Sequence, residues 1–307
     1  MGGNEALDIN AGVGPQANLA ITRHGSDWYF TVCAVMGFAT LVFMGMSFTK
    51  PQSHRLFHYI TALITLVAGI AYYSMGSGLG QTPVLVEFVR LDSSDVAAAG
   101  TREFFYVRYI DWFVTTPLLL TDLMLTAGMP WPTILVTILA DEVMIVTGLV
   151  GALTPTSFKW GYWAFGMVAF FYVVYTLVWN ARRNAAALGG AVAQTYLVCG
   201  VLTIFVWFLY PIAWGLAEGG NVIHPDSEAI FYGVLDIIAK PVFGFMLLLG
   251  HRNIDPATIG LHFREPGTLT GKHNGSQMEQ HGTGITTGNT AGATTASAQP
   301  ATTQATV

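Results

Sequence analysis

The chain has 307 residues, of which 52% belong to the hydrophobic set AVILMFWYC and only 10% are charged. A soluble globular protein carries roughly 25% charged residues. This balance excludes a water-soluble enzyme, a nucleic-acid-binding protein and a disordered chain, and the net charge of −5 offers no basic surface for phosphate groups. Cys33 and Cys199 both lie inside apolar runs, so we expect two buried thiols rather than a disulfide.

A bilayer core about 30 Å thick requires roughly 20 mostly apolar residues in each spanning helix. Seven stretches have this length: Trp28–Thr49, Leu56–Met75, Phe104–Met129, Trp131–Leu153, Trp160–Ala181, a segment within Ala185–Ala217, and Ala229–Gly250. Backbone polar groups in lipid must be bonded within the protein, and the short alternating segments typical of a β-barrel are not found. The sequence therefore predicts an all-α membrane protein built as a bundle of seven transmembrane helices.

The flanking segments predict three regions: an extracellular N-terminal tail over residues 1–26, the helical domain over 27–252, and a largely disordered cytoplasmic tail over 253–307. The tail has no aromatic residue after Phe263. Basic residues near helix ends slightly favour this orientation, with Lys50, Arg55, Arg182, Arg183 and Arg252 inside and Arg23, Arg90, Arg102 and Lys159 outside. The long second loop predicts a hairpin at Val84–Val89.

Ionisable side chains inside the predicted helices need an explanation, because each costs roughly 2.5–3.5 kcal/mol on insertion scales. They are Arg108, Asp111 and Asp122 in the third helix, Asp141 and Glu142 in the fourth, and Asp236 and Lys240 in the seventh. One explanation is ion pairing that only holds helices together. The other is a proton relay, because Arg108, Asp111 and Thr115 share one helix face and Asp122 returns to it three turns later.

Lys240 is the most informative of these residues. A buried amine can condense with an aldehyde to form a Schiff base. Asp236, one turn away, and Asp111, on another helix, could keep such an imine protonated. A purely structural Lys–Asp pair is the alternative.

Aromatic residues gather at the same depth, namely Trp112, Trp163, Trp207, Tyr210 and Trp214, with Pro211 interrupting the sixth helix. They could wall a flat apolar ligand, although packing alone also explains each of them.

Several runs resemble the bacteriorhodopsin-type microbial rhodopsins. Residues 108–122 (RYIDWFVTTPLLLTD) resemble the third helix of that family, and Leu235–Lys240 (LDIIAK) resembles its seventh. Trp207, Tyr210, Pro211 and Trp214 resemble the sixth helix, and Asp141, Met144 and residues 147–151 (TGLVG) the fourth. The similarity extends over about residues 28–252, and the long second loop and tails resemble fungal-type members.

The resemblance implies all-trans-retinal bound to Lys240 as a protonated Schiff base and isomerised by light. It makes Asp111 the primary proton acceptor and counterion, Asp236 the second counterion, and Asp122 the cytoplasmic proton donor. Arg108 would couple the counterions to an extracellular release pair, Glu218 and Glu228.

The same resemblance supplies the pocket. Tyr72 and Tyr210 would hydrogen-bond near Asp236. The remaining pocket residues are Trp112, Trp163 and Trp207, which would line the retinal, and Thr116, Asp141 and Met144, which would complete the pocket. No metal site is predicted.

The triplet Asp111, Thr115 and Asp122 matches proton-pumping members of the family. The leading interpretation is therefore a light-driven outward proton pump, a transporter rather than an enzyme, in the plasma membrane. Its partners are retinal, protons and the lipid bilayer, with a trimer or another homo-oligomer left open. The alternatives are a photosensor that signals through a partner protein, which Asp122 disfavours, and an opsin without retinal, which Lys240 disfavours.

Overall fold

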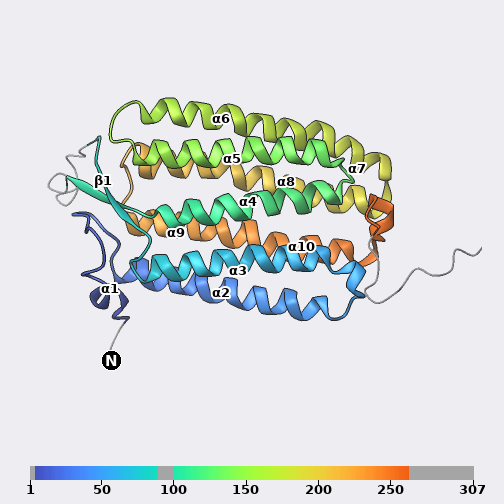
Figure 1. The fold of residues 1–307 in the computed structure, drawn as a ribbon, viewed down its shortest axis with the longest axis horizontal. Coiled ribbons are helices and arrows are strands. Elements are labelled where there is room, and N and C mark those ends of the chain that lie inside the picture. The colour runs from blue at the N-terminus through green and yellow to red at the C-terminus, as the bar shows by residue number, and fades with distance from the viewer. Residues whose placement is uncertain (1–3, 89–99, 263–307) are drawn as a thin grey trace, which may run out of the picture. The chain divides into compact units, whose positions relative to one another are not determined.

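The computed structural model describes residues 4–88 and 100–262, and in this part of the chain seven long helical rods run side by side (Figure 1). The first four rods are α2 (Arg23–Ser47), α3 (Leu56–Gly76), α4 (Tyr106–Thr126) and α5 (Trp131–Leu153). The fifth is α6 (Lys159–Tyr175), the π-helical η2 (Thr176–Ala181) and α7 (Arg182–Leu188), and the sixth is α8 (Gly190–Trp214) with the π-helical η3 (Gly215–Gly219). The seventh is α9 (Pro225–Ile237), the π-helical η4 (Ile238–Val242) and α10 (Phe243–Gly250).

Short elements connect and flank these rods: α1 (Ala6–Ile9), η1 (Gln52–His54), η5 (His251–Asn253) and η6 (Pro256–Ile259). Residues 263–307, which make up most of the predicted cytoplasmic tail, lie outside the described residues.

The predicted seven-helix bundle is confirmed. Six of the rods are long and apolar enough to cross a membrane by composition alone. The seventh is α4, which carries Arg108, Asp111 and Asp122 in 21 residues and is therefore less apolar than the others. The chain is a multi-pass membrane protein.

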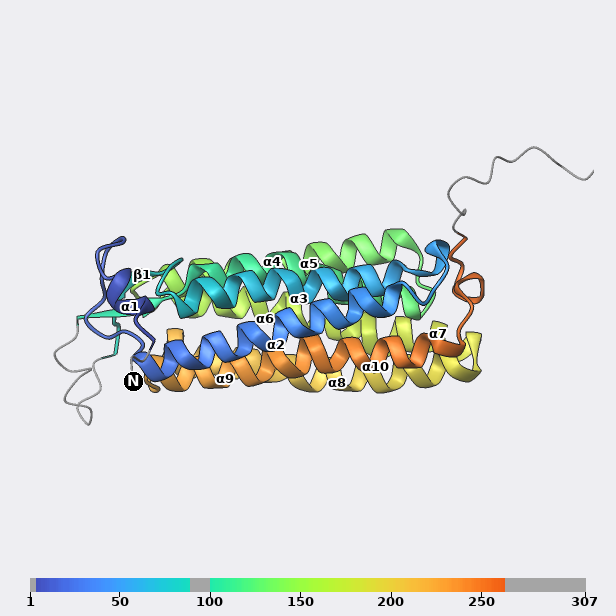
Figure 2. The ribbon, with the colours of Figure 1, turned by 90° about the horizontal axis from the view of Figure 1, so that it is seen from below.

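Large apolar side chains cover the outside of the bundle. Phe38, Leu41, Leu139, Val168 and Phe205 are each at least 65% exposed. A soluble protein rarely leaves so much apolar surface in contact with water, whereas lipid solvates it without cost. Consecutive helices pack against each other, and α9 packs against α2 to close the ring around a buried centre (Figures 1 and 2).

A two-stranded sheet lies at one end of the bundle, which we call the hairpin end (Figure 1). Strand β1 (Thr82–Leu85) pairs antiparallel with β2 (Thr101–Phe104), and Val84 lies opposite Arg102. The predicted hairpin at Val84–Val89 is therefore wrong, because the partner strand comes after a much longer connection. Leu19 bonds to the far edge of β2, donating to the carbonyl of Thr101 and accepting from the N–H of Glu103.

Prolines and π-helical segments interrupt the rods at the centre. Pro117 lies inside α4, Pro211 inside α8 and Pro241 inside η4. Proline has no N–H to donate, so each of these helices loses a regular hydrogen bond. Single π-helical turns often mark functional sites, and η4 contains Lys240.

Candidate retinal and proton-transfer site

Lys240 meets two carboxylates at the centre of the bundle. Its Nζ donates to Oδ2 of Asp111, which lies on α4, at 2.6 Å. The same Nζ lies 3.1 Å from Oδ2 of Asp236, which precedes Lys240 by one helical turn. All three side chains are almost fully buried. Charges removed from water are tolerated only when they are paired, so this amine requires its two acids.

The two carboxylates differ in how completely they are bonded. Asp236 accepts from the hydroxyl of Tyr72 at 2.8 Å and from that of Tyr210 at 2.5 Å, so both of its oxygens are occupied. Asp111 Oδ1 is buried without a hydrogen-bond partner among residues 4–88 and 100–262. The Thr115 hydroxyl bonds to the backbone carbonyl of Asp111 at 2.8 Å. Of the two acids, Asp111 has the free oxygen that can take up a proton.

An apolar cavity opens beside Lys240. Most predicted pocket residues line it: Trp112, Thr116, Met144, Trp163, Trp207, Tyr210, Pro211, Trp214, Asp236 and Lys240. The lining is completed by Tyr109, Leu119, Ile145, Gly148, Gly166, Met167, Phe170 and Ala239.

Asp141 lies outside the cavity lining and acts on it through another residue. Its Oδ2 accepts from the Thr116 hydroxyl at 2.6 Å, and Thr116 lines the cavity. Asp141 is fully buried, and its Oδ1 has no hydrogen-bond partner in the described part of the chain. The pair joins α5 to α4 beside the pocket.

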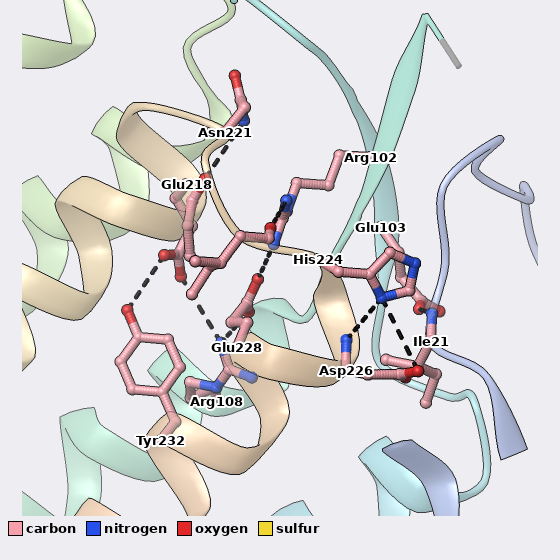
Figure 3. Close-up of polar contacts among 12 residues, drawn as sticks. Ile21, Arg102, Glu103, Arg108, Glu218, Asn221, His224, Asp226, Glu228 and Tyr232 are labelled. Atoms are coloured by element: carbon pink, nitrogen blue, oxygen red, sulfur yellow. Dashed lines mark hydrogen bonds and ion pairs between the residues drawn. The ribbon is translucent and has the colours of Figure 1, made fainter. Parts of the chain in front are cut away.

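A second charged cluster lies at the hairpin end (Figure 3). Arg108 Nη1 donates to Glu228 Oε1 at 2.5 Å and lies 3.6 Å from Glu218 Oε1. Its Nη2 donates to the Tyr29 hydroxyl at 2.8 Å. The structure thus brings together Arg108, Glu218 and Glu228 as a group.

Two residues of strand β2 join this cluster although the sequence did not single them out as site residues. Arg102 Nη2 donates to Glu228 Oε2 at 2.7 Å. Glu103 is buried beside it and accepts from the Ile21 N–H at 2.8 Å. Burial raises the pKa of Glu103 to about 7, and Glu228 and Asp226 add to the rise, while the Ile21 N–H and Arg102 oppose it.

Asp122 lies alone by comparison, near the other end of α4. It is fully buried, and neither carboxyl oxygen has a hydrogen-bond partner among the described residues. The hydroxyl of Thr126 bonds to its backbone carbonyl at 2.7 Å and lies 3.3 Å from His251 Nε2. An isolated carboxyl in such surroundings is more stable protonated than charged.

A family model described as "Bacteriorhodopsin-like protein" matches residues 24–254. The opsin-like protein carO of Fusarium fujikuroi is 60% identical over 264 residues, 85% of this chain and 85% of that protein. The chain belongs to the bacteriorhodopsin-like family.

Two solved bacteriorhodopsin-like structures are described as light-driven proton pumps. The rhodopsin CsR of Coccomyxa subellipsoidea is 39% identical, with a TM-score of 0.71, over 76% of this chain and 99% of that one. LR (Mac) from Leptosphaeria maculans is 37% identical, with a TM-score of 0.72, over 77% of this chain and 99% of that one.

The pocket of this bacteriorhodopsin-like chain fits the retinal that its family binds. The cavity is lined mostly by apolar and aromatic side chains, and one primary amine, that of Lys240, reaches it. The indole N–H groups of Trp112 and Trp163 are buried without partners in the described chain. Gly166 lets α6 pack closely against α5 at the cavity wall, because a Cβ at this position would lie 2.9 Å from Thr147 Oγ1.

Proposed function

We propose that this protein is a light-driven outward proton pump with all-trans-retinal attached to Lys240. The observation that carries the proposal is the arrangement along α4, where Asp111 meets Lys240 Nζ at 2.6 Å and Asp122 lies three turns beyond it. An acceptor and a donor on opposite sides of one nitrogen are what directional transfer requires. Retinal, when bound, supplies the light absorption and the change of shape that drive transfer.

The chain's own residues can carry the proton in one direction. Asp111 Oδ2 accepts the proton held on the Lys240 nitrogen, because it is the closest base and Asp236 is already saturated by two tyrosine hydroxyls. Asp122 then returns a proton to that nitrogen from the other side. Arg108 and its two glutamates lie between Asp111 and the hairpin end and provide the exit.

The direction follows from the orientation that we propose. Residues 1–26 and the hairpin end face the outside of the plasma membrane, and residues from 253 onward face the cytoplasm, as the positions of the basic residues favour. Since α4 starts at the hairpin end, transfer from Asp122 toward Asp111 moves a proton outward. Each proton moved stores about 2.3 kcal/mol per 100 mV of membrane potential.

The test is illumination of cells that express the full chain with all-trans-retinal in weakly buffered medium. The external pH should fall in the light, and a protonophore should abolish the fall. Cells with Lys240→Ala serve as the matched control and should show no pH change. A coloured protein without a pH change would favour the photosensor, and a colourless wild-type protein would refute retinal binding.

A further inference from the structure

Arg102 reaches from the hairpin into the cluster of acids at the hairpin end. It belongs to β2, which leads directly into α4, and lies six residues before Arg108. Its side chain is buried, with Nη2 on Glu228 Oε2 at 2.7 Å and Nη1 on the Ile223 carbonyl at 2.6 Å. A planar guanidinium can make both hydrogen bonds at once because its N–H donors are held in a fixed planar arrangement, which an ammonium group does not have.

Glu228 is therefore held between two guanidinium groups (Figure 3). Arg108 occupies its Oε1 at 2.5 Å and Arg102 its Oε2 at 2.7 Å. A proton on either oxygen would displace a short, charge-assisted hydrogen bond. Glu228 is thus fixed as a carboxylate.

Glu218 has a different set of neighbours. Its carboxyl oxygens accept hydrogen bonds from the Tyr232 hydroxyl at 3.1 Å and the Tyr109 hydroxyl at 3.4 Å. Arg108 Nη1 lies 3.6 Å from Glu218 Oε1. The amine of Lys159 faces its backbone carbonyl at 3.4 Å and forms an ion pair with Glu87. Buried among longer contacts from mainly neutral donors, this carboxyl is the one that can hold a proton.

Arg102 also lies close to Glu218. Glu218, Arg102 and Asn221 line a small cavity between the hairpin and the end of the sixth rod, together with Glu103 and Phe104. Removing Arg102 would therefore change both the charge on Glu228 and the surroundings of the proton on Glu218.

We propose that Arg102 is a positioning residue for proton release: it holds Glu228 ionised, so that Glu218 alone carries the proton that leaves at the hairpin end. This inference rests on the proposed pumping function. A merely structural Arg102 would tie the hairpin to the Ile223 carbonyl without affecting where the proton resides.

The first test follows a single light flash with a soluble pH dye on the full-length, retinal-bound protein. In Arg102→Gln, proton release should be delayed roughly tenfold, because a change of one pKa unit changes a proton equilibrium tenfold. Proton uptake should keep its wild-type rate. Arg102→Lys should recover part of the rate, because the charge returns without the planar arrangement of donors. Arg23→Gln is the control, since Arg23 is an exposed cation paired with Asp8.

The second test locates the proton by infrared difference spectroscopy of the protonated carboxyl groups. A band that vanishes in Glu218→Gln and persists in Glu228→Gln supports the inference, and the reverse pattern overturns it. Wild-type timing of release in Arg102→Gln also overturns it. A wild-type protein that releases no proton would instead refute the pump, while the infrared comparison still decides which glutamate is protonated.

Discussion

The two halves of the bundle on either side of Lys240 differ in how their buried ionisable side chains are hydrogen-bonded. Toward the hairpin end, Asp111 and Asp236 pair with Lys240, and Asp236 also accepts from two tyrosine hydroxyls. Arg108 pairs with Glu228 and donates to the hydroxyl of Tyr29. Toward the opposite end, Asp122 is buried with no partner on either carboxyl oxygen within the described residues. In the pump that we propose, the first half would pass a proton along polar groups, whereas the second would supply it from one isolated carboxyl, and this difference would give transfer its direction.

The largest effect is expected where the two halves meet. Among residues 4–88 and 100–262, Lys240 has the only primary amine that reaches the cavity, so in Lys240→Ala absorption in the visible range should be lost entirely when retinal is added. A spectrum of the purified protein measures this. A pigment band of wild-type intensity in that variant would show that retinal is attached elsewhere.

Asp122→Asn tests the half of the bundle that holds the isolated carboxyl. This change keeps the size of the side chain but removes its proton, so uptake after a flash should slow by roughly 10²-fold and become strongly pH-dependent. Time-resolved absorption with a pH dye measures the rate. Uptake as fast as in the wild type would contradict the donor role that we propose for Asp122.

The polar half should show its own pH dependence through Glu103. Burial raises its pKa from 4.5 to about 7, so the folded protein keeps a proton that the unfolded chain releases in this range. The contribution of Glu103 to the free energy of unfolding should therefore be fully present below pH 4.5. It should be lost as the pH rises through 7, which lowers the free energy of unfolding by up to about 3 kcal/mol.

Glu103→Gln should abolish that fall, since glutamine cannot ionise, and thermal unfolding in detergent between pH 4 and 8 measures it. Asp8→Asn, an exposed acid at the same end, should behave as the wild type does. A fall of the same size in Glu103→Gln would assign the pH dependence to other groups.

A smaller effect is expected beside the pocket. Thr116→Val leaves Asp141 buried without its one hydrogen-bond donor and should cost roughly 1–3 kcal/mol of stability. In the double variant with Asp141→Asn, part of that loss should be recovered. Thermal unfolding of the four proteins measures the coupling, and fully additive losses would mean that the hydrogen bond contributes nothing.

The sequence predicted the fold from the length of its apolar stretches and the centre of the site from ionisable residues inside them. Seven apolar stretches became seven rods, and the spacing of Asp236 and Lys240 placed them one turn apart. Asp111 was predicted as the second acid for Lys240 because it is an ionisable residue inside another helix, and the resemblance then assigned it the role of counterion.

The contacts of the hairpin end could not be predicted in this way. Arg102 and Glu228 are 126 residues apart, and Arg102 lies in a strand whose partner, β1, precedes it by a long connection. Tyr29 reaches Arg108 from another helix, and nothing in its local sequence marks that contact. Pairings between distant segments depend on how the helices pack, and a periodic pattern describes only one helix at a time.

The most direct test of the contrast between the halves is a sided measurement of proton movement. Closed vesicles with the protein in one known orientation would carry a pH dye either inside or outside during a flash. We predict that protons leave the solution at the α10 end and appear at the hairpin end, and that Asp122→Asn slows only the former. Net movement in the reverse direction, or none across the membrane, would contradict the account.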